Sequence, residues 1–142
     1  MKKLLIALGC AMLAISMTAC GSNDAAPAEK EVKKEPTDLT GAWKSEESEG
    51  TYQEAVINDG TIEINWINDA EQTKALYWIG SYEAPTEAVD TYSWTSAGDI
   101  ETMASALLAS QDETKDFKYE NGKITYEASA MGVTKTVELS KE

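Results

Sequence analysis

Cys20 is the residue whose surroundings in the sequence most clearly indicate a chemical reaction. Lysines at positions 2 and 3 are followed by an apolar run over residues 4–15 and then by small residues that lead directly to Cys20. This order is typical of a secretory signal peptide that is cleaved just ahead of residue 20. A helix of about twelve residues would span about 18 Å, well short of the roughly 30 Å hydrocarbon core of a bilayer. The segment therefore predicts a signal over residues 1–19, and not a membrane span.

The residues around the predicted cleavage site, Ser-Met-Thr-Ala-Cys over 16–20, resemble the lipobox of bacterial lipoproteins. In that family an aliphatic residue and two small residues precede a cysteine that receives a diacylglyceryl group and becomes the mature N-terminus. Met17 stands where the family usually has leucine. The resemblance implies that Cys20 carries a thioether-linked lipid and anchors the protein on the extracytoplasmic face of the cell membrane. The alternative is an ordinary secretory signal followed by a bystander cysteine.

The other residue types leave few routes to catalysis. The chain has no histidine and only two cysteines, of which Cys10 leaves with the signal and Cys20 is used by the lipid. A disulfide, a thiol nucleophile, a histidine-based triad and a histidine zinc site are therefore excluded. Carboxylate catalysis, a Ser-Lys pair or calcium on oxygen ligands would remain possible, but no residue spacing indicates them. We expect no enzyme, no catalytic residue, no metal site and no cofactor.

The charge of the mature chain is strongly negative. After cleavage the chain contains ten lysines and 25 acidic residues, which gives a formal charge of −15. Arginine is absent. A field of this sign repels phosphate backbones, so we expect no nucleic-acid partner. Acidic clusters over residues 46–49 and 83–90 would steer a basic protein partner, or are simply solvated loops.

The chain divides into three predicted parts. Residues 21–38 consist mainly of Ala, Pro, Glu, Lys, Ser and Asp, and such a segment buries too little apolar surface to offset the entropy of ordering. We therefore predict a signal over 1–19, a lipid-anchored disordered tether over 20–38, and one folded domain over 39–142.

The predicted domain consists mainly of short antiparallel strands. Residues 61–66 alternate strictly, so that Ile62, Ile64 and Trp66 share one face. Three dipeptides predict tight hairpin turns: Asp59-Gly60, Asn121-Gly122 and Met131-Gly132. About eight such strands form an all-β meander, which we expect to close into a small barrel because closure removes exposed edges.

One segment of the domain has a different pattern. Behind a potential N-cap at Asp99, apolar residues recur at helical spacing as far as Leu108. This predicts one short helix near 99–110, with the alternative that residues 106–110 pair as a strand.

The start of the domain carries a second resemblance. Residues 39–43, Leu-Thr-Gly-Ala-Trp, are similar to the Gly-x-Trp signature that opens the first strand of lipocalin-like (calycin) barrels. The resemblance implies a lipocalin-like barrel in which a basic residue of a late strand covers the tryptophan. Lys135 shares the inward parity of Val137 and Leu139, so we expect it to lie over the ring of Trp43 as a cation-π contact. The family usually has arginine there. The alternative leaves the Lys135 amine in solvent at a twisted edge.

The aromatic residues of the middle of the chain suggest a binding role. The candidate binding surface consists of Tyr77, Trp78 and Tyr82. Tyr77 is expected to be exposed because it faces opposite to Trp78. Trp66 and Trp94 are expected in the core. We expect a binding module for a small amphipathic ligand or an envelope peptide. The alternative is a protein-protein interaction factor of inhibitor, immunity or exclusion type without a small ligand. Residues 75–78 and 131–136 also resemble small uncharacterised cell-surface lipoproteins of Gram-positive bacteria.

Overall fold

The structure, a computed structural model, describes residues 34–142, so the predicted signal, Cys20 and most of the predicted tether lie outside the described residues. The packed unit begins at Glu35. The last residues of the expected tether belong to it, because the Thr37 hydroxyl donates to the Val89 carbonyl at 2.9 Å and accepts from the Val89 N–H at 2.8 Å.

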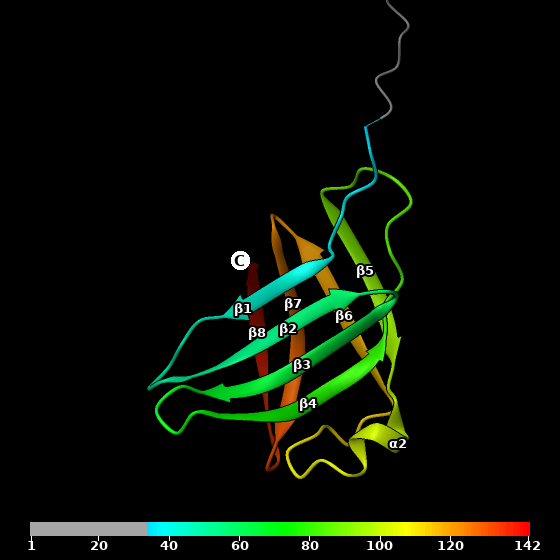
Figure 1. Ribbon diagram of the computed structural model, residues 1–142. Coiled ribbons are helices and arrows are strands. Elements are labelled where there is room, and N and C mark those ends of the chain that lie inside the picture. Colours follow the sequence, from blue (N-terminus) through cyan, green and yellow to red (C-terminus); the bar gives the residue numbers. More distant parts are fainter. Residues whose placement is uncertain (1–33) are drawn as a thin grey trace, which may run out of the picture. The chain divides into compact units, whose positions relative to one another are not determined.

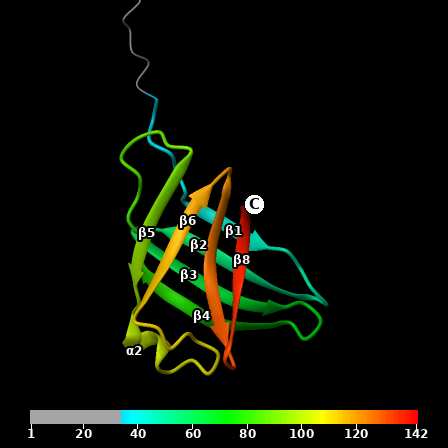
Figure 2. The ribbon, with the colours of Figure 1, turned by 180° about the vertical axis from the view of Figure 1, so that it is seen from behind.

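Eight antiparallel strands form a single sheet, as predicted (Figures 1 and 2). Each strand pairs with the next in sequence except at β4–β5, and β1 also pairs with β8, giving the order β4-β3-β2-β1-β8-β7-β6-β5. The sheet curls into a half-barrel. The strands are β1 (Gly41–Ser45), β2 (Thr51–Asn58), β3 (Thr61–Asn68), β4 (Thr73–Ser81), β5 (Thr91–Ala97), β6 (Thr114–Glu120), β7 (Lys123–Ala130) and β8 (Val133–Lys141).

Three of the hairpins turn on the dipeptides that the sequence indicated. Both central residues have positive φ in each turn, which is the geometry that matches the twist of the flanking strands. The φ angles are 48° and 76° at Asp59-Gly60, 54° and 80° at Asn121-Gly122, and 54° and 81° at Met131-Gly132.

The two ends of the sheet, β4 and β5, meet without forming a ladder. Gly80 and Gly98 make a single bridge, and Ser110 donates its backbone N–H to the Tyr77 carbonyl at 2.8 Å. A Cβ atom on Gly80 would lie 2.5 Å from Ser96 Oγ and 2.6 Å from the Ala97 carbonyl oxygen, so this close approach requires glycine.

The segment beside this seam contains the one helix of the described chain, α2 (Ile100–Met103). The Asp99 carboxylate caps it by accepting from the Thr102 N–H at 3.0 Å, as the sequence predicted. The helix ends after one turn, and the chain continues through turns, with the Ala106 N–H donating to the Met103 carbonyl, as far as the bond between Ser110 and β4. The alternative strand over 106–110 does not form. Among the described residues no helix is long and apolar enough to cross a membrane.

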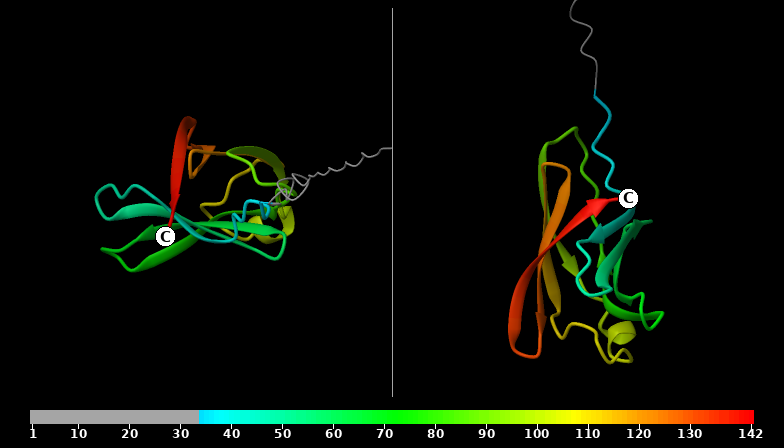
Figure 3. Two further views of the ribbon diagram at one scale, coloured as in Figure 1. Left: turned by 90° about the horizontal axis from the view of Figure 1, so that it is seen from above. Right: turned by 90° about the vertical axis from the view of Figure 1, so that its left-hand side faces the viewer.

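The join between β1 and β8 is short. It consists of three residue pairs, Trp43 with Lys141, Lys44 with Ser140 and Ser45 with Leu139. Beyond Leu139, toward Val133, β8 diverges from β1 and β2, and within residues 34–142 no strand pairs with it on the side away from β7 (Figure 3).

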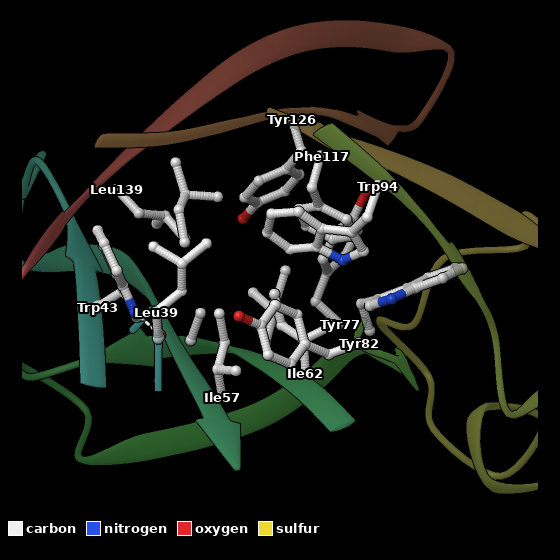
Figure 4. Packing of buried hydrophobic residues seen from close by; sticks show 14 of the residues in the cluster. Leu39, Trp43, Ile57, Ile62, Tyr77, Tyr82, Trp94, Phe117, Tyr126 and Leu139 are labelled. Carbon is white, nitrogen blue, oxygen red and sulfur yellow. Dashed lines mark hydrogen bonds between the residues drawn. The ribbon is translucent and has the colours of Figure 1, made fainter. Parts of the chain in front are cut away.

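Side chains fill the concave side of the half-barrel (Figure 4). An aromatic row crosses the strands: Trp94 stacks on Phe117 with ring centroids 5.1 Å apart, and Phe117 lies 5.2 Å from Tyr126. Tyr82 meets Trp94 edge-on at 5.2 Å. The buried apolar residues are Leu39, Trp43, Ala55, Ile57, Ile62, Ile64, Tyr77, Trp78, Tyr82, Trp94, Met103, Phe117, Ile124, Tyr126, Ala128 and Leu139.

Replacing Gly80 with alanine tests the seam. Because the new methyl group overlaps Ser96 and the β5 backbone, we expect Gly80→Ala to lower the free energy of unfolding by about 1–3 kcal/mol in chemical denaturation. Lys74→Ala, at an exposed position of the same strand, is the control and should change it by less than about 0.5 kcal/mol. Equal stability of the two variants would show that the seam tolerates a side chain.

Candidate functional site

The aromatic residues predicted as a binding surface are part of the core instead. Tyr77, Trp78 and Tyr82 are 1%, 0% and 7% exposed. Tyr77 packs edge-on against Trp66 at 5.6 Å, and the Trp78 indole N–H donates to Ser96 Oγ at 3.1 Å. Burial raises the pKa of Tyr82 to about 12. The expectation that Tyr77 is exposed was wrong, and the three residues of the candidate binding surface are buried.

A β-bulge explains why Tyr77 and Trp78 are both inside. Ile64 of β3 pairs with Trp78, but the next residue, Asn65, pairs with Leu76, which leaves Tyr77 as an extra residue on β4. An extra residue breaks the strict in-and-out alternation, so two consecutive side chains turn to the same side. The sequence showed apolar residues on both faces of this strand, and the bulge is the reason.

The expected contact between Lys135 and Trp43 is also wrong. Trp43 is buried, and its indole N–H donates to the Leu39 carbonyl at 2.9 Å. The cation over its ring is Lys141, with Nζ 5.6 Å from the centroid and 3.1 Å from the Asp38 carbonyl oxygen. The register of β8 places Lys141 opposite Trp43, whereas Lys135 pairs with Ala128 nearer the hairpin tip and is exposed.

Trp94 is buried as expected, but Trp66 is only partly buried. Trp66 stands between two hollows in the surface and lines both of them. These two hollows are the candidate functional site.

The first, which we call the tip hollow, has a volume of about 440 Å³. It lies between the 107–112 segment and the β7–β8 turn. Apolar side chains that are largely exposed to solvent surround it, with Leu107 and Leu108 on one side and Met131 on the other. Val133 extends the exposed apolar surface next to the turn. The lining residues are Trp66, Leu107, Leu108, Ala109, Ser110, Gln111, Asp112, Ser129, Ala130, Met131 and Gly132.

The second, which we call the edge hollow, has a volume of about 280 Å³ and lies where β8 diverges from β2. Its wall combines a partly buried apolar surface with charged side chains. The lining residues are Ser45, Glu46, Ser48, Thr51, Tyr52, Gln53, Trp66, Lys135, Val137 and Glu138.

Gln53 gives the edge hollow an unusual polar group. The side chain is 1% exposed, and its Oε1 accepts a hydrogen bond from the Tyr126 hydroxyl, whose pKa is raised by burial. Within the described chain, Gln53 Nε2 is buried without a hydrogen-bond partner. A buried donor left unpaired costs about 1–3 kcal/mol, so an acceptor at this position would be stabilising.

The buried cation of the domain has a structural explanation. Lys115 Nζ donates to Asp112 Oδ2 at 2.9 Å and to the Glu127 carbonyl oxygen at 3.1 Å. It also lies 5.4 Å from the Tyr77 ring centroid and 5.2 Å from that of Trp78. The hydrogen bond from Lys115, with another from Ser110, lowers the pKa of Asp112. Lys115 is therefore fully engaged in holding the 110–115 segment to the core.

A third depression, of about 800 Å³, runs along the outer face of β5 to β7. Exposed polar side chains, among them Thr95, Asp116 and Lys118, project from it, and Thr95 already donates to Asp116 at 2.6 Å. Its lining mixes polar and apolar surface, but none of the exposed large apolar side chains of the described chain borders it. Among the described residues no group of three or more His, Cys, Asp and Glu side chains is arranged to hold a metal ion.

Comparison of the chain with protein-family models, with curated proteins and with solved structures finds no match in any of the three.

Sequence reasoning did not bring these residues together as hollows. Leu107 and Leu108 fit a helical stripe and so indicated a helix, and Gln53 carried no signal. Met131 offered one: it occupies a turn position with φ of 54°, where a small or polar residue is usual. A large apolar side chain at such a turn is exposed by necessity.

Paired substitutions test which lysine stabilises Trp43. Lys141→Met removes the cation over the ring and the bond to Asp38, and we expect it to lower the free energy of unfolding by about 0.5–1 kcal/mol. Lys135→Met is the matched control, and its effect should stay below about 0.5 kcal/mol. A larger loss for the Lys135 variant in urea titrations would contradict the assignment.

Proposed function

We propose that this protein is a lipoprotein anchored through Cys20 on the extracytoplasmic face of the membrane, with a head that binds an amphipathic ligand at the tip hollow. The observation that carries the binding role is the set of exposed apolar side chains around that hollow, Leu107, Leu108 and Met131. Exposed apolar patches of this kind are typical of interaction sites.

The packing of the half-barrel supports a site at the surface and not in its interior. The position that a lipocalin-like barrel would use for a ligand is filled by Trp94, Phe117 and Tyr126 (Figure 4). This filled interior also favours the second candidate function, an interaction factor whose ligand is a segment of another protein.

The tip hollow lies away from the segment that leads into the domain. The segment ahead of β1, cyan in Figure 1, enters the half-barrel at the end opposite α2 and the β7–β8 turn, and this turn borders the tip hollow. A ligand at the tip hollow would therefore not contact the segment by which the chain enters the domain.

Replacing Cys20 with serine tests the anchor. Cys20→Ser removes the sulfur that would carry the lipid, so the variant expressed from the full sequence should leave the membrane fraction. Intact-protein mass spectrometry should find a diacylglyceryl adduct on the parent protein and none on the variant. An unmodified parent protein recovered in soluble form would contradict the proposal. Cys10→Ser is the control and should not change the adduct.

Replacing the exposed apolar side chains tests the tip hollow. With a dansyl-labelled dodecylamine as the probe, we expect the double variant Leu107→Ser/Met131→Ser to bind about tenfold more weakly, because it loses apolar contact area. Val56→Ser changes an apolar residue of partial exposure on β2 and is the control, with affinity within about twofold of the parent. Fluorescence titration measures both. Unchanged affinity in the double variant would show that the amphiphile does not bind at the tip hollow.

A further inference from the structure

We propose that the unpaired edge of β8, residues 133–138, binds an extended cationic peptide as an added strand, with alternate side chains of the peptide entering the edge hollow. This inference rests on the proposed binding role and adds the chemical class of the ligand and its mode of binding.

The hairpin geometry shows which backbone groups of β8 are free. Met131-Gly132 is a two-residue turn, so Ala130 and Val133 exchange hydrogen bonds, and every second residue of β8 from Val133 onward bonds to β7. The residues between them, Thr134, Thr136 and Glu138, direct their N–H and C=O groups away from β7. The next residue in that series, Ser140, faces Lys44 of β1.

The strand that would cover this edge ends too early. β1 stops at Ser45, whose hydroxyl accepts from the Gln53 N–H at 2.9 Å, and the chain then turns away to form a bridge between Ser48 and Thr51. Within the described residues, the place beside Thr134 to Glu138 has no strand. An open row of donors and acceptors is a template for an extended peptide.

The edge hollow provides the side-chain contacts for such a peptide. An added strand would lie along the outer edge of Lys135 to Glu138, and its inward side chains would meet Trp66 and the partly buried Val137. Gln53 lines the same hollow, and its Nε2, buried without a partner in the described chain, would donate to a peptide oxygen once the side chain turns toward the hollow. The hollow thus offers apolar contact and one directed hydrogen bond.

The charge at the rim of the edge hollow favours a peptide of positive charge. Glu46 and Glu138 line the hollow together with Lys135, and the loop after Glu46 continues with Glu47 and Glu49. Glu138 pairs with Lys123 and Glu47 lies 3.8 Å from Lys44, so the excess negative charge at the rim comes from Glu46 and Glu49. The whole chain carries a formal charge of −13. A cationic peptide is therefore attracted, and a second copy of this acidic chain is repelled. At about 3.4 Å per residue, the free edge accommodates roughly six residues that alternate between apolar and cationic types.

A lysine-valine peptide tests the inference on the full chain. The probe is a nine-residue peptide of alternating lysine and valine, blocked at both ends, and a glutamate-valine peptide is its charge control. We expect the first to bind at least tenfold more tightly. On isotope-labelled protein, NMR amide exchange should slow at Thr134, Thr136 and Glu138 when it binds.

A pair of variants at Thr136 tests the edge itself. Thr136→Pro removes an outward N–H without removing a hydrogen bond to β7, so peptide affinity should fall at least tenfold. Thr136→Ala keeps the N–H and should bind within about twofold of the parent. A lysine-valine peptide N-methylated on alternate residues gives the same information on the unchanged protein, and it should lose affinity to the same degree.

The outcomes separate this inference from the proposed function. Equal binding by the proline variant, equal binding of the glutamate peptide, or no protection at the three amides would overturn strand addition. If the lysine-valine peptide fails to bind while the dansyl amphiphile still binds at Leu107 and Met131, the proposed strand addition is wrong and the proposed binding at the tip hollow is supported. If the amphiphile fails to bind and the peptide slows exchange of the β8 amides, the proposed binding at the tip hollow is wrong and strand addition at the β8 edge is supported.

Discussion

The short pairing between β1 and β8 is the constraint on which the rest of the structure depends. It is the only ladder that joins the first four strands to the last four in the described chain, and it holds just three residue pairs. Because β1 has five residues and β8 has nine, the pairing closes the sheet at one end and leaves it open at the other. Both hollows lie toward this open end, and Trp66 separates them.

The aromatic row across β5 to β7 explains why ligand contacts must be sought outside the interior. Trp94, Phe117 and Tyr126 are directly opposed across neighbouring strands, and the row continues to Val137 of β8. Aromatic pairs in such arrangements contribute about 0.5–1.5 kcal/mol beyond their buried area. The row therefore stabilises the sheet and occupies its concave side, and its last member, Val137, lies in the wall of the edge hollow.

Local patterns in the sequence were sufficient for the strands and turns but not for the contacts between distant strands. The Asp-Gly and Asn-Gly turns, the Asp99 cap and the inward position of Trp94 follow from rules that act within a few residues. The burial of Tyr77 depends on a bulge opposite Asn65, and a single extra residue reverses the expected side. Likewise, Lys135 and Lys141 have the same parity, and only the register of β8 against β1 decides which one reaches Trp43. The hollows arise from where β1 ends relative to β8, which no local pattern encodes.

The two ends of the packed unit lie next to each other. Lys141 Nζ donates to the Asp38 carbonyl oxygen, and the Glu142 N–H donates to the Ala42 carbonyl oxygen at 3.0 Å. With β1 beside β8, the order of strands is a ring of neighbours interrupted only at the β4–β5 seam. A short linker from residue 142 to residue 38 would therefore preserve every ladder, and a circularly permuted chain could begin at the open Asn121-Gly122 turn without losing the fold.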